Sequence, residues 1–597
     1  MLLDRYGDML TPVDCGCGSA GFVVQTTDDL TLECSYASEG IYEITVSSSG
    51  SSSEGSVIAL TLPLADATAF WQPGIRGSVP LAPDWHGDVA VSLVKSAPMG
   101  CLLDAGDNCL FGFGFSLAVG ESTMQYGVDE ERDLFVVFLR FRMHGGRERL
   151  LVMDAAASLT LIDAGRQLSA FIRGDYDRMP APDNAREPVF STWYARLQDV
   201  TSDYLLSEAD GMAALGCRSV FVDDGWQEKA HGRGYAGCGD WIADSVKFPD
   251  LKKTVDLLHD KGLSVILWIA PLLVGEKSKA WQDVSDQNPI YLPGQDLNVH
   301  VLDPRRAVNR SHIARTCRRL MDEYGADGLK IDFLDQASRY QGLAAPTGDD
   351  DCDDVGEAML ALLSAVKTVI SEGRSNPPIV EFRSPYVNPV LGSYANVLRA
   401  SDCPSDSIAN RCGVMDARII SDGRIVDSDM LLWNVGSRPT ACAQQIMSAF
   451  FGVPQISVTP SVMTPSQQAV CQRLLNLWRK YRQVILDGRL TAGAQALAYP
   501  VISAVGDGTQ ITGVYAQNVV VDVDARDTHH LVLLNATNSC VVTIRMRGLI
   551  CDHPLQLIAT DAAGARERNN VVDSHVDNGT SIADMLVEPF GVLEMNW

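Results

Sequence analysis

The chain lacks the features that mark membrane proteins and nucleic-acid-binding proteins. Its apolar runs, such as residues 264–271, have the length of a strand, and none approaches the roughly 20 residues that a membrane-spanning helix needs. Residues 1–8 contain neither the basic nor the apolar part of a signal peptide. Acidic residues outnumber basic residues 75 to 48, and the net charge of −27 disfavours contact with phosphate backbones and anionic lipids. We therefore expect a cytoplasmic protein with neither a nucleic acid nor a membrane as its partner.

Recognisable metal and cofactor motifs are missing as well. The ten histidines are dispersed, no HExxH pattern occurs, and neither GxGxxG string, at 16–21 or 232–237, directly joins a strand-like run to a helical stretch. The 15 cysteines are scattered and odd in number, so we expect reduced thiols; Cys15 and Cys17 form the one tight pair, without a partner pair for a metal site. The acidic loop 348–354 fits a cap of the helix that follows it, with calcium binding as the alternative. We expect no cofactor and no catalytic metal.

The first third of the chain has the pattern of an all-β domain. The length of 597 residues suggests roughly three to four domains, and residues 1–185 form the first of them. Long helical periodicity is absent there, and Gly, Ser and Asp clusters separate β-branched and aromatic runs, as in a β-sandwich. The clearest runs are 22–26, 41–46 and 134–139.

Between residues 186 and 486, short apolar runs alternate with helical stretches such as 251–261, 313–324 and 355–370. This alternation predicts βα units around a parallel sheet. The eight strand-like runs are 189–193, 219–224, 264–271, 328–334, 378–383, 396–402, 425–432 and 454–459. Eight units in about 300 residues are the size of a TIM barrel; a doubly wound sheet is the alternative, but none of these runs passes through a Gly-rich turn directly into a helical stretch.

Strand-like runs return from residue 487 to the end of the chain. They are residues 510–515, 530–534, 541–546 and 586–596. The predicted fold class is therefore α/β, with a (β/α)8 TIM barrel in residues 186–486. An N-terminal β-sandwich in residues 1–185 precedes the barrel, and a C-terminal antiparallel β-domain in residues 487–597 follows it.

Carboxylates gather at the carboxyl ends of the predicted barrel strands, where TIM barrels carry their function. Five of the eight ends hold them, namely Asp223 with Asp224, Asp332, Glu381, Asp402, and Asp427 with Asp429. A single Asp after a strand is usually a helix cap or turn residue, as we expect for Asp335 and Asp406. Five such ends indicate more, because crowded carboxylates repel and do not stabilise a fold.

Lys330 and Asp332 are the most informative pair. They lie two residues apart on a strand, so both side chains point to one face, while Ile331 and Phe333 point to the other. At the top of a barrel the ammonium group would lower the pKa of Asp332 and keep it ionised, as a nucleophile requires. A buried ion pair is the structural alternative.

Cleavage of a glycosidic bond needs two carboxyl groups, one to attack the anomeric carbon and one to protonate the leaving oxygen. The fourth and sixth strands face each other across part of the mouth, so Asp402 is well placed as the partner of Asp332. Neighbouring carboxylates would raise the pKa of Asp402, which suits a general acid. Four tryptophans at the rim could offer flat surfaces to sugar rings or belong to the core: Trp193, Trp226, Trp241 and Trp268.

At these residues the chain resembles glycoside hydrolase family 36, the α-galactosidase family in the same clan as family 27. The resemblance rests on Val222–Trp226, Gly239–Trp241, Lys330–Phe333 and Arg399–Asp402, and on the order of β-sandwich, barrel and β-domain. It implies a retaining, exo-acting α-glycoside hydrolase that releases terminal galactose from oligosaccharides by double displacement.

The resemblance also implies roles for residues. Asp332 would be the nucleophile and Asp402 the acid/base. The implied substrate-binding residues are Asp223, Asp224, Trp241, Trp268, Lys330, Arg383 and Arg399. The two aspartates would accept hydrogen bonds from sugar hydroxyls, and Lys330 and Arg399 would donate to hydroxyls nearer the anomeric carbon. The two tryptophans would wall the pocket.

Residues 382–386 depart from the family pattern, which often has a Cys-Ser-Gly-Gly-type turn near the 2-substituent of the sugar. Arg383 and Tyr386 stand here in place of small residues. The glycone therefore stays open among galactose, N-acetylgalactosamine, xylose and β-L-arabinopyranose. Transglycosylation and non-catalytic sugar binding are the alternative functions, and neither the aglycone nor association into a homo-oligomer follows from the sequence.

Overall fold

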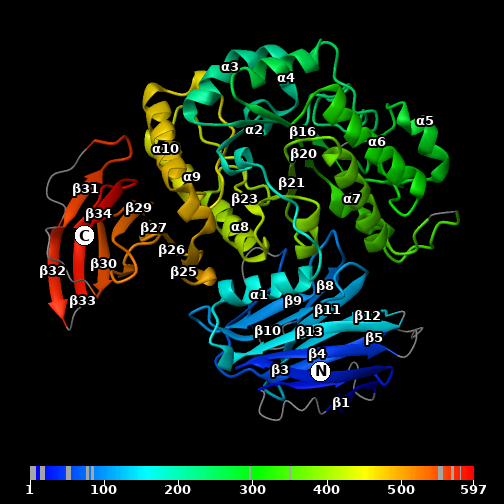
Figure 1. Cartoon of the computed structure of the whole chain (residues 1–597), viewed down its shortest axis with the longest axis horizontal. Coiled ribbons are helices and arrows are strands. Elements are labelled where there is room, and N and C mark those ends of the chain that lie inside the picture. Colours follow the sequence, from blue (N-terminus) through cyan, green and yellow to red (C-terminus); the bar gives the residue numbers. More distant parts are fainter. Residues whose placement is uncertain are drawn as a thin grey trace.

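A computed structural model describes residues 9–597 except 14–20, 49–54, 75–78, 82–85, 144, 295–297, 349–350, 549–554, 566–570 and 578–579. Two paired sheets at the N-terminus, a barrel with its helices, and two C-terminal sheets follow one another along the chain (Figure 1). The Cys15–Cys17 pair and part of the acidic loop lie outside the described residues. Asp354, which ends that loop, caps the helix α7 (Val355–Ser371) as expected, since its carboxylate accepts from Glu357 N.

Two antiparallel sheets form the N-terminal β-sandwich. The first sheet has the order β1-β2-β5-β12-β11-β8 and the second β3-β4-β13-β10-β9-β6-β7. Their bounds are β1 Thr11–Val13, β2 Val23–Thr26, β3 Leu30–Ser38, β4 Ile41–Ser48, β5 Ser56–Pro63, β6 Ala69–Trp71, β7 Val79–Pro80, β8 His86–Val91, β9 Met99–Leu103, β10 Cys109–Phe115, β11 Ser122–Asp129, β12 Leu134–Phe141 and β13 Gly146–Asp154. Side chains such as Ile58 and Phe135 of the first sheet and Ile44 and Phe113 of the second share one apolar core.

The helix α1 (Leu161–Arg173) corrects the expectation that residues 1–185 lack a long helix. Thr160 caps it by accepting a hydrogen bond from Asp163 N. Its buried face, which includes Leu168 and Ile172, packs on β10 and on the barrel helix α8 (Ser407–Ile420). The helix therefore joins the sandwich to the barrel (Figure 1).

All eight predicted barrel strands are present and parallel. They are β14 Val189–Ser191, β15 Ser219–Val222, β16 Ser264–Ile269, β20 Gly328–Ile331, β21 Ile379–Arg383, β22 Val397–Arg399, β23 Ile425–Asp427 and β24 Gln455–Ile456. Their order is β23-β22-β21-β20-β16-β15-β14-β24, and parallel bridges from Asp427 to Val453 and from Leu431 to Ile456 bring the ends together. Several strands are shorter than predicted, because residues such as Met430 are buried in rim loops instead of strands.

Helices cover the outside of the barrel. They are α2 Trp193–Arg196, α3 Ser202–Leu215, α4 Leu251–His259, α5 Ala280–Val284, α6 Ala307–Glu323, α7, α8, α9 Pro439–Ser448 and α10 Pro465–Asp487. A small sheet of β17 Leu273–Gly275, β18 Ile290–Tyr291 and β19 Val299–Val301 follows β16. Thr464 and Gln467 form a capping box at the start of α10, with Pro465 in its first turn.

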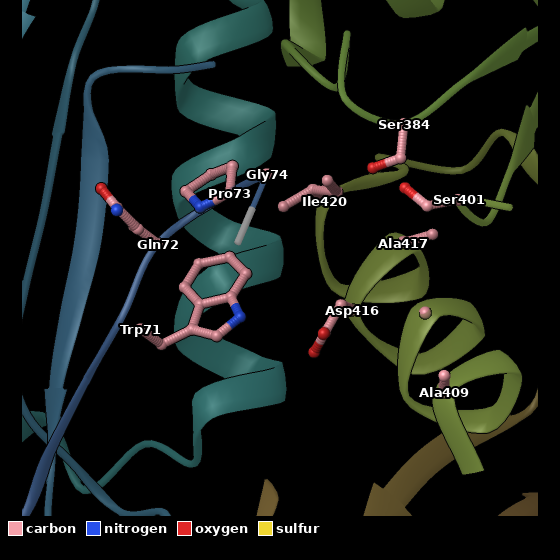
Figure 2. Close-up of a pocket in the computed structure, with 11 residues that line it drawn as sticks. Trp71, Gln72, Pro73, Gly74, Ser384, Ser401, Ala409, Asp416, Ala417 and Ile420 are labelled. Carbon is pink, nitrogen blue, oxygen red and sulfur yellow. The ribbon is translucent and has the colours of Figure 1, made fainter. Parts of the chain in front are cut away.

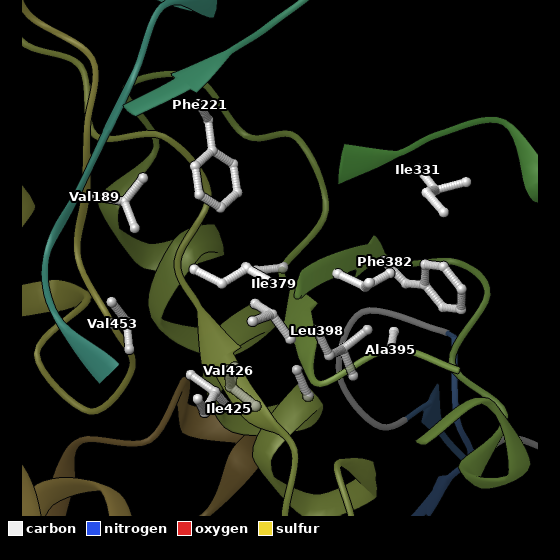
Figure 3. Packing of buried hydrophobic residues seen from close by; sticks show 14 of the residues in the cluster. Val189, Phe221, Ile331, Ile379, Phe382, Ala395, Leu398, Ile425, Val426 and Val453 are labelled. Atoms are coloured by element: carbon white, nitrogen blue, oxygen red, sulfur yellow. The ribbon is translucent and has the colours of Figure 1, made fainter. Parts of the chain in front are cut away.

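Apolar side chains of the strands pack in the layer between strands and helices. Figure 3 shows Phe221, Ile331, Ile379 and Leu398 among this buried set. At Gly328 a Cβ atom would lie 2.0 Å from the carbonyl oxygen of Ile379, so only glycine allows β20 and β21 to approach this closely. The packing fixes the strand ends that carry the polar rim.

The C-terminal domain pairs a six-stranded sheet, β25-β26-β27-β29-β34-β31, with a four-stranded sheet, β28-β30-β33-β32. Its strands are β25 Arg489–Ala492, β26 Val501–Gly506, β27 Thr509–Val514, β28 Val520–Asp524, β29 His530–Asn535, β30 Val541–Arg547, β31 Gln556–Thr560, β32 Val571–Asp577, β33 Thr580–Leu586 and β34 Val592–Asn596. Most neighbours are antiparallel, but β27 with β29 and β28 with β30 are parallel because the chain alternates between the two sheets. The predicted run 586–596 is interrupted by a turn before β34.

Two further observations concern the whole described chain. None of the described helices combines the length and the apolarity that crossing a bilayer would require. Cys34 is disulfide-bonded, which contradicts the expectation of reduced thiols at this residue, whereas thiols such as Cys101, Cys217 and Cys471 are free and buried.

Candidate active site

The predicted site residues come together at the carboxyl ends of the barrel strands. Asp223 and Asp224 follow β15, Trp268 lies in β16, and Asp332 directly follows β20. Arg383 ends β21 and Arg399 ends β22. Parallel strands deliver their carboxyl ends to one rim, so the order of the motifs along the chain becomes a ring of side chains.

Asp332 is buried, and both of its carboxylate oxygens are bound. Oδ1 accepts from Arg383 Nε at 2.5 Å and from Phe333 N at 2.7 Å, and Oδ2 accepts from Trp268 Nε1 at 3.1 Å. Burial by itself would raise the pKa of Asp332, but the charges of Arg383 and Lys330 and the bond from Trp268 outweigh it and lower that pKa. Asp332 is therefore an ionised carboxylate at neutral pH.

Lys330 points to the same face as Asp332 but binds a different carboxylate. Its Nζ donates to Asp223 Oδ2 at 2.6 Å and lies 3.9 Å from Glu381 Oε1. Lys330 lowers the pKa of Asp332 as predicted, but the guanidinium of Arg383 makes the direct contact and the larger electrostatic contribution. The ion pair of Lys330 instead anchors Asp223.

Asp224 has a different environment from its neighbour Asp223. Its carboxylate accepts from Gln198 Nε2 at 2.7 Å and from Gln227 Nε2 at 2.6 Å, with no cation within ion-pair distance among the described residues. Burial raises the pKa of Asp224 to about 7, although both amide bonds oppose that rise. The pair thus combines an ion-paired carboxylate with one that titrates near neutrality.

Asp402 is the exposed carboxylate of the rim, with 55% of its side chain accessible. Arg399 Nη2 lies 2.8 Å from Asp402 Oδ1, and Arg399 Nη1 donates to Asp429 Oδ1 at 2.6 Å. Partial desolvation by the surrounding protein would raise the pKa of Asp402, but Arg399, Arg383 and Lys330 lower it well below the usual range. The expectation of a raised pKa at Asp402 is therefore wrong, since the direct ion-pair partner of this carboxylate is Arg399.

Asp332 and Asp402 belong to one electrostatic unit. The charge of each raises the pKa of both Arg383 and Arg399. Each carboxylate has one of these arginines as its direct partner. The two carboxylates therefore face one shared cationic group of side chains.

Beneath the rim lies a buried carboxylate pair that sequence analysis did not assign a role. Gln455 Nε2 donates to Glu381 Oε2 at 2.5 Å and to Asp427 Oδ2 at 2.8 Å. Burial and the nearby charge of Glu381 raise the pKa of Asp427 well above its usual range, so Asp427 keeps its proton. Gln455 lies on β24, and the polar residue within that apolar run was the available signal.

The rim tryptophans divide into two groups. Trp268 stacks on Tyr235 with ring centroids 6.1 Å apart, and Trp241 meets Trp268 edge-on at 5.6 Å. Trp226 is fully buried and donates from Nε1 to the carbonyl of Trp268, so it belongs to the core. Trp193 is half-buried under the guanidinium of Arg233. Tyr235 was missed because its loop carries no strand or helix pattern.

The N-terminal domain lies next to the rim, with a small cavity between them. Figure 2 shows Trp71, Gln72 and Pro73 of that domain across a small cavity from Ser384 and Ser401. The cavity measures about 40 Å³. Ser384 follows Arg383 and Ser401 precedes Asp402 in the chain, so this contact lies directly behind two rim residues. The described residues include no cluster of three His, Cys, Asp or Glu side chains suited to a metal ion.

Comparison with known proteins finds similarity to one family over part of the chain. A Melibiase family model matches residues 160–383. Alpha-galactosidase 1 of Pediococcus pentosaceus is 28% identical over 165 residues, and Alpha-galactosidase Mel36A of Lactobacillus acidophilus is 27% identical over 156 residues. These alignments cover 27% and 25% of this chain and 22% and 21% of the relatives, so the chain matches only about a fifth of their length.

The fold is similar over nearly the whole chain to that of solved structures. The GH36 alpha-galactosidase AgaA from Geobacillus stearothermophilus matches 96% of this chain and 81% of its own, with a TM-score of 0.62 at 16% identity. A variant of that protein in complex with raffinose matches 97% and 82%, also with a TM-score of 0.62 at 16% identity. TtGalA from Thermus thermophilus matches 78% of this chain and 94% of its own, with a TM-score of 0.55 at 18% identity.

Proposed function

We propose that this chain, a GH36 α-galactosidase-like protein in its family-model match and its fold, is a retaining α-galactosidase that releases terminal galactose from oligosaccharides. The observation that carries the proposal is the state of Asp332. It is a buried, ionised carboxylate at the end of β20, held by Arg383 and Trp268. The names of the relatives and the raffinose complex support galactose as the sugar.

In the proposed first step, Asp332 attacks the anomeric carbon and the glycosidic C–O bond breaks. Asp402 gives its proton to the leaving oxygen, and the sugar becomes a glycosyl ester of Asp332. In the second step, Asp402 takes a proton from water while the water oxygen attacks the anomeric carbon and releases Asp332. Retention of configuration requires the two carboxyl groups to lie about 5–5.5 Å apart.

The ion pair between Asp402 and Arg399 sets a condition on this mechanism. A general acid must be protonated when it acts, yet Arg399, Arg383 and Lys330 lower the pKa of Asp402. Binding of an aglycone over this exposed carboxylate removes water and raises its pKa. We expect kcat/KM, which reports the free enzyme, to fall as the pH rises above the lowered pKa of Asp402.

The remaining rim residues are proposed to bind the sugar. Asp223 and Asp224 accept hydrogen bonds from hydroxyls, Lys330 and Arg399 donate near the anomeric carbon, and Trp241 and Trp268 wall the pocket. Their clustering around Asp332 supports these assignments. Arg383, fixed on Asp332, narrows the side of the pocket at the 2-substituent, which favours galactose over N-acetylgalactosamine.

The test is hydrolysis of nitrophenyl α-galactoside by the wild-type chain and by two matched variants. D332A should lose activity by several orders of magnitude, because the covalent step has no nucleophile. D335N changes a carboxylate three residues further along, in the short 3-10 helix Leu334–Tyr340, and should retain most activity. Wild-type activity in D332A would refute the assignment, and a β-configured first product by NMR would refute retention.

A second panel tests the sugar and the reaction class. It compares nitrophenyl α-glycosides of galactose, N-acetylgalactosamine, xylose and glucose with β-L-arabinopyranoside. One relative, from Flavonifractor plautii and 27% identical over 150 residues, is named an A type blood alpha-D-galactosamine galactosaminidase, so the amino sugar is a required comparison. Product analysis at high acceptor concentration distinguishes hydrolysis from transglycosylation. Association into a homo-oligomer stays a prediction.

A further inference from the structure

A second polar cavity lies at the opposite end of the barrel from the proposed active site. Its volume is about 490 Å³. It is bordered by α1, by the segments that lead into β14 and β23, and by the C-terminal end of α10. Because these segments precede the strands, the cavity opens at the amino-terminal ends of the barrel, and it shares no residue with the carboxylate rim.

The charge of this cavity is opposite to that of the chain. Five arginines and two aspartates line it, which leaves three positive charges in excess, whereas the whole chain carries −27. The charged lining residues are Arg166, Arg178, Arg186, Arg418, Arg424, Asp422 and Asp487. In a chain this acidic, five arginines from separate segments meeting at one cavity require an explanation.

The two aspartates are already engaged by arginines. Asp422 pairs with Arg178 at 2.7 Å and also binds Arg173, which lies outside the cavity. Asp487 pairs with Arg186 at 2.5 Å. Among the described residues, no carboxylate forms an ion pair with Arg166, Arg418 or Arg424. Three of the five guanidinium groups thus have no anionic partner there.

Two of the unpaired arginines lie deep in the wall. Arg418 is 5% exposed and donates to the carbonyls of Phe451, Ile485 and Leu486, which is a structural role at the end of α10. Arg424 is 7% exposed, and its Nη1 and Nη2 atoms are buried without a hydrogen-bond partner in the described structure.

Burial keeps the pKa values of these two groups below that of an ordinary arginine. It lowers the pKa of Arg424 to about 10; burial together with repulsion from Arg166 lowers that of Arg418 to about 9. The charges of Asp422 and Asp487 offset this lowering for Arg424 and Arg418 only in part, and holding desolvated cations together is costly. An anion bound in the cavity would therefore stabilise the charged forms of Arg418 and Arg424.

Arg166 has no structural role of the kind that Arg418 has. Arg166 is half-buried on α1. Burial lowers its pKa, and the charge of Asp163 on the same helix opposes that change. Arg178 and Arg186 are 51% and 28% exposed at their side chains, so both can turn toward a ligand. Arginine forks match the geometry of phosphate oxygens and bind them bidentately.

We propose that this cavity is a binding site for a small phosphate-bearing molecule. Arg166, Arg178 and Arg186 contact the phosphate oxygens, and Arg418 and Arg424 supply fixed positive charge from the wall. The site is independent of the proposed glycosidase activity, because it lies at the other end of the barrel.

Isothermal titration of the full chain with pyrophosphate and with inorganic phosphate, at constant ionic strength set by sodium chloride, tests the proposal. We expect saturable binding of one ligand per chain. R166Q and R186Q should each weaken pyrophosphate binding by about tenfold or more, because each removes one charge-assisted contact. R147Q, which removes an exposed arginine of β13 outside the cavity, should leave the affinity unchanged.

A second cavity variant and a control at Asp332 make the result of the titration interpretable. If one cavity variant fails to fold, as judged by its melting temperature in chloride, the other still reports on the site. D332A must bind pyrophosphate like the wild type, so a failure of the proposed activity does not affect this result. Absence of saturable binding at millimolar ligand, or equal binding by the wild type, R166Q and R186Q, would overturn the proposal. Weakening by R147Q as large as by R166Q would also overturn it, since that pattern reports net charge alone.

Discussion

Replacing Arg383 with alanine is expected to slow release of the sugar from Asp332 more than its attachment. Arg383 Nε donates to Asp332 Oδ1 at 2.5 Å and makes the largest charge contribution that lowers the pKa of Asp332. In the second step of the proposed mechanism the negative charge returns to this carboxylate, so its cationic partner stabilises the leaving group. Trp268 and Lys330 stay in place in the variant and keep the site polar.

The magnitude follows from the lost contact. A hydrogen bond between charged groups contributes about 1.5–3 kcal/mol, which corresponds to a fall of about 10- to 150-fold in the rate of the second step. When that step limits turnover, kcat and KM fall together while kcat/KM changes less. Without Arg383 the pKa of Asp332 rises, because burial then loses its largest opposing charge while Lys330 and the bond from Trp268 remain. The acid limb of kcat/KM therefore moves to higher pH.

The assay is steady-state hydrolysis of nitrophenyl α-galactoside across the acidic and neutral range, with a pre-steady-state burst as the sign of accumulated glycosyl enzyme. R339A serves as the control, since Arg339 is an exposed arginine that donates to Gln336. An R383A variant with an unshifted acid limb and an unchanged kcat would refute the reasoning. Equal losses in kcat and kcat/KM without a burst would refute the role in the second step.

Three further predictions concern stability and are measured by chemical denaturation or melting. K330M should lose about 3–5 kcal/mol, because it leaves the buried carboxylate of Asp223 unpaired, and a loss below 1 kcal/mol would contradict the ion pair. Asp224 has a pKa raised to about 7, above about 3.9 in the unfolded chain, so its stabilising contribution is complete below pH ~4 and is lost toward pH ~7. D224N should flatten the fall in stability across that window, and an identical pH dependence would contradict the shift. G328A should destabilise the barrel strongly, because its Cβ would lie 2.0 Å from the oxygen of Ile379, and a melting temperature like that of the wild type would contradict the close approach.

The local sequence pattern predicted the barrel because each strand can be recognised from its own residues. Runs such as 264–269 and 379–383 are apolar, β-branched and bounded by helical stretches, so each strand is recognised from local sequence, and the alternation with helices predicts parallel pairing. The helix α1 was missed for the opposite reason. Its apolar face is buried by packing against β10 and α8, and both of these elements lie far from α1 in the sequence.

The positions of the rim residues also followed from the sequence, whereas their partners did not. The two-residue spacing of Lys330 and Asp332 places both on one face, and parallel strands bring their ends to one rim. Whether Lys330 pairs with Asp332 or with Asp223, 107 residues away, depends on how β20 and β15, which are separated by β16, are placed in the closed barrel.

The protonation states were likewise decided by the tertiary structure. The motif around Asp402 suggested carboxylate neighbours and a raised pKa, yet the folded chain places Arg399 and Arg383 against it and lowers that pKa. Electrostatic energies vary with separations of a few ångströms and with burial. Side-chain identity and strand pattern were thus determined by the sequence itself, while the pairing of charges, and with it the state of each acid, was decided only when distant segments packed together.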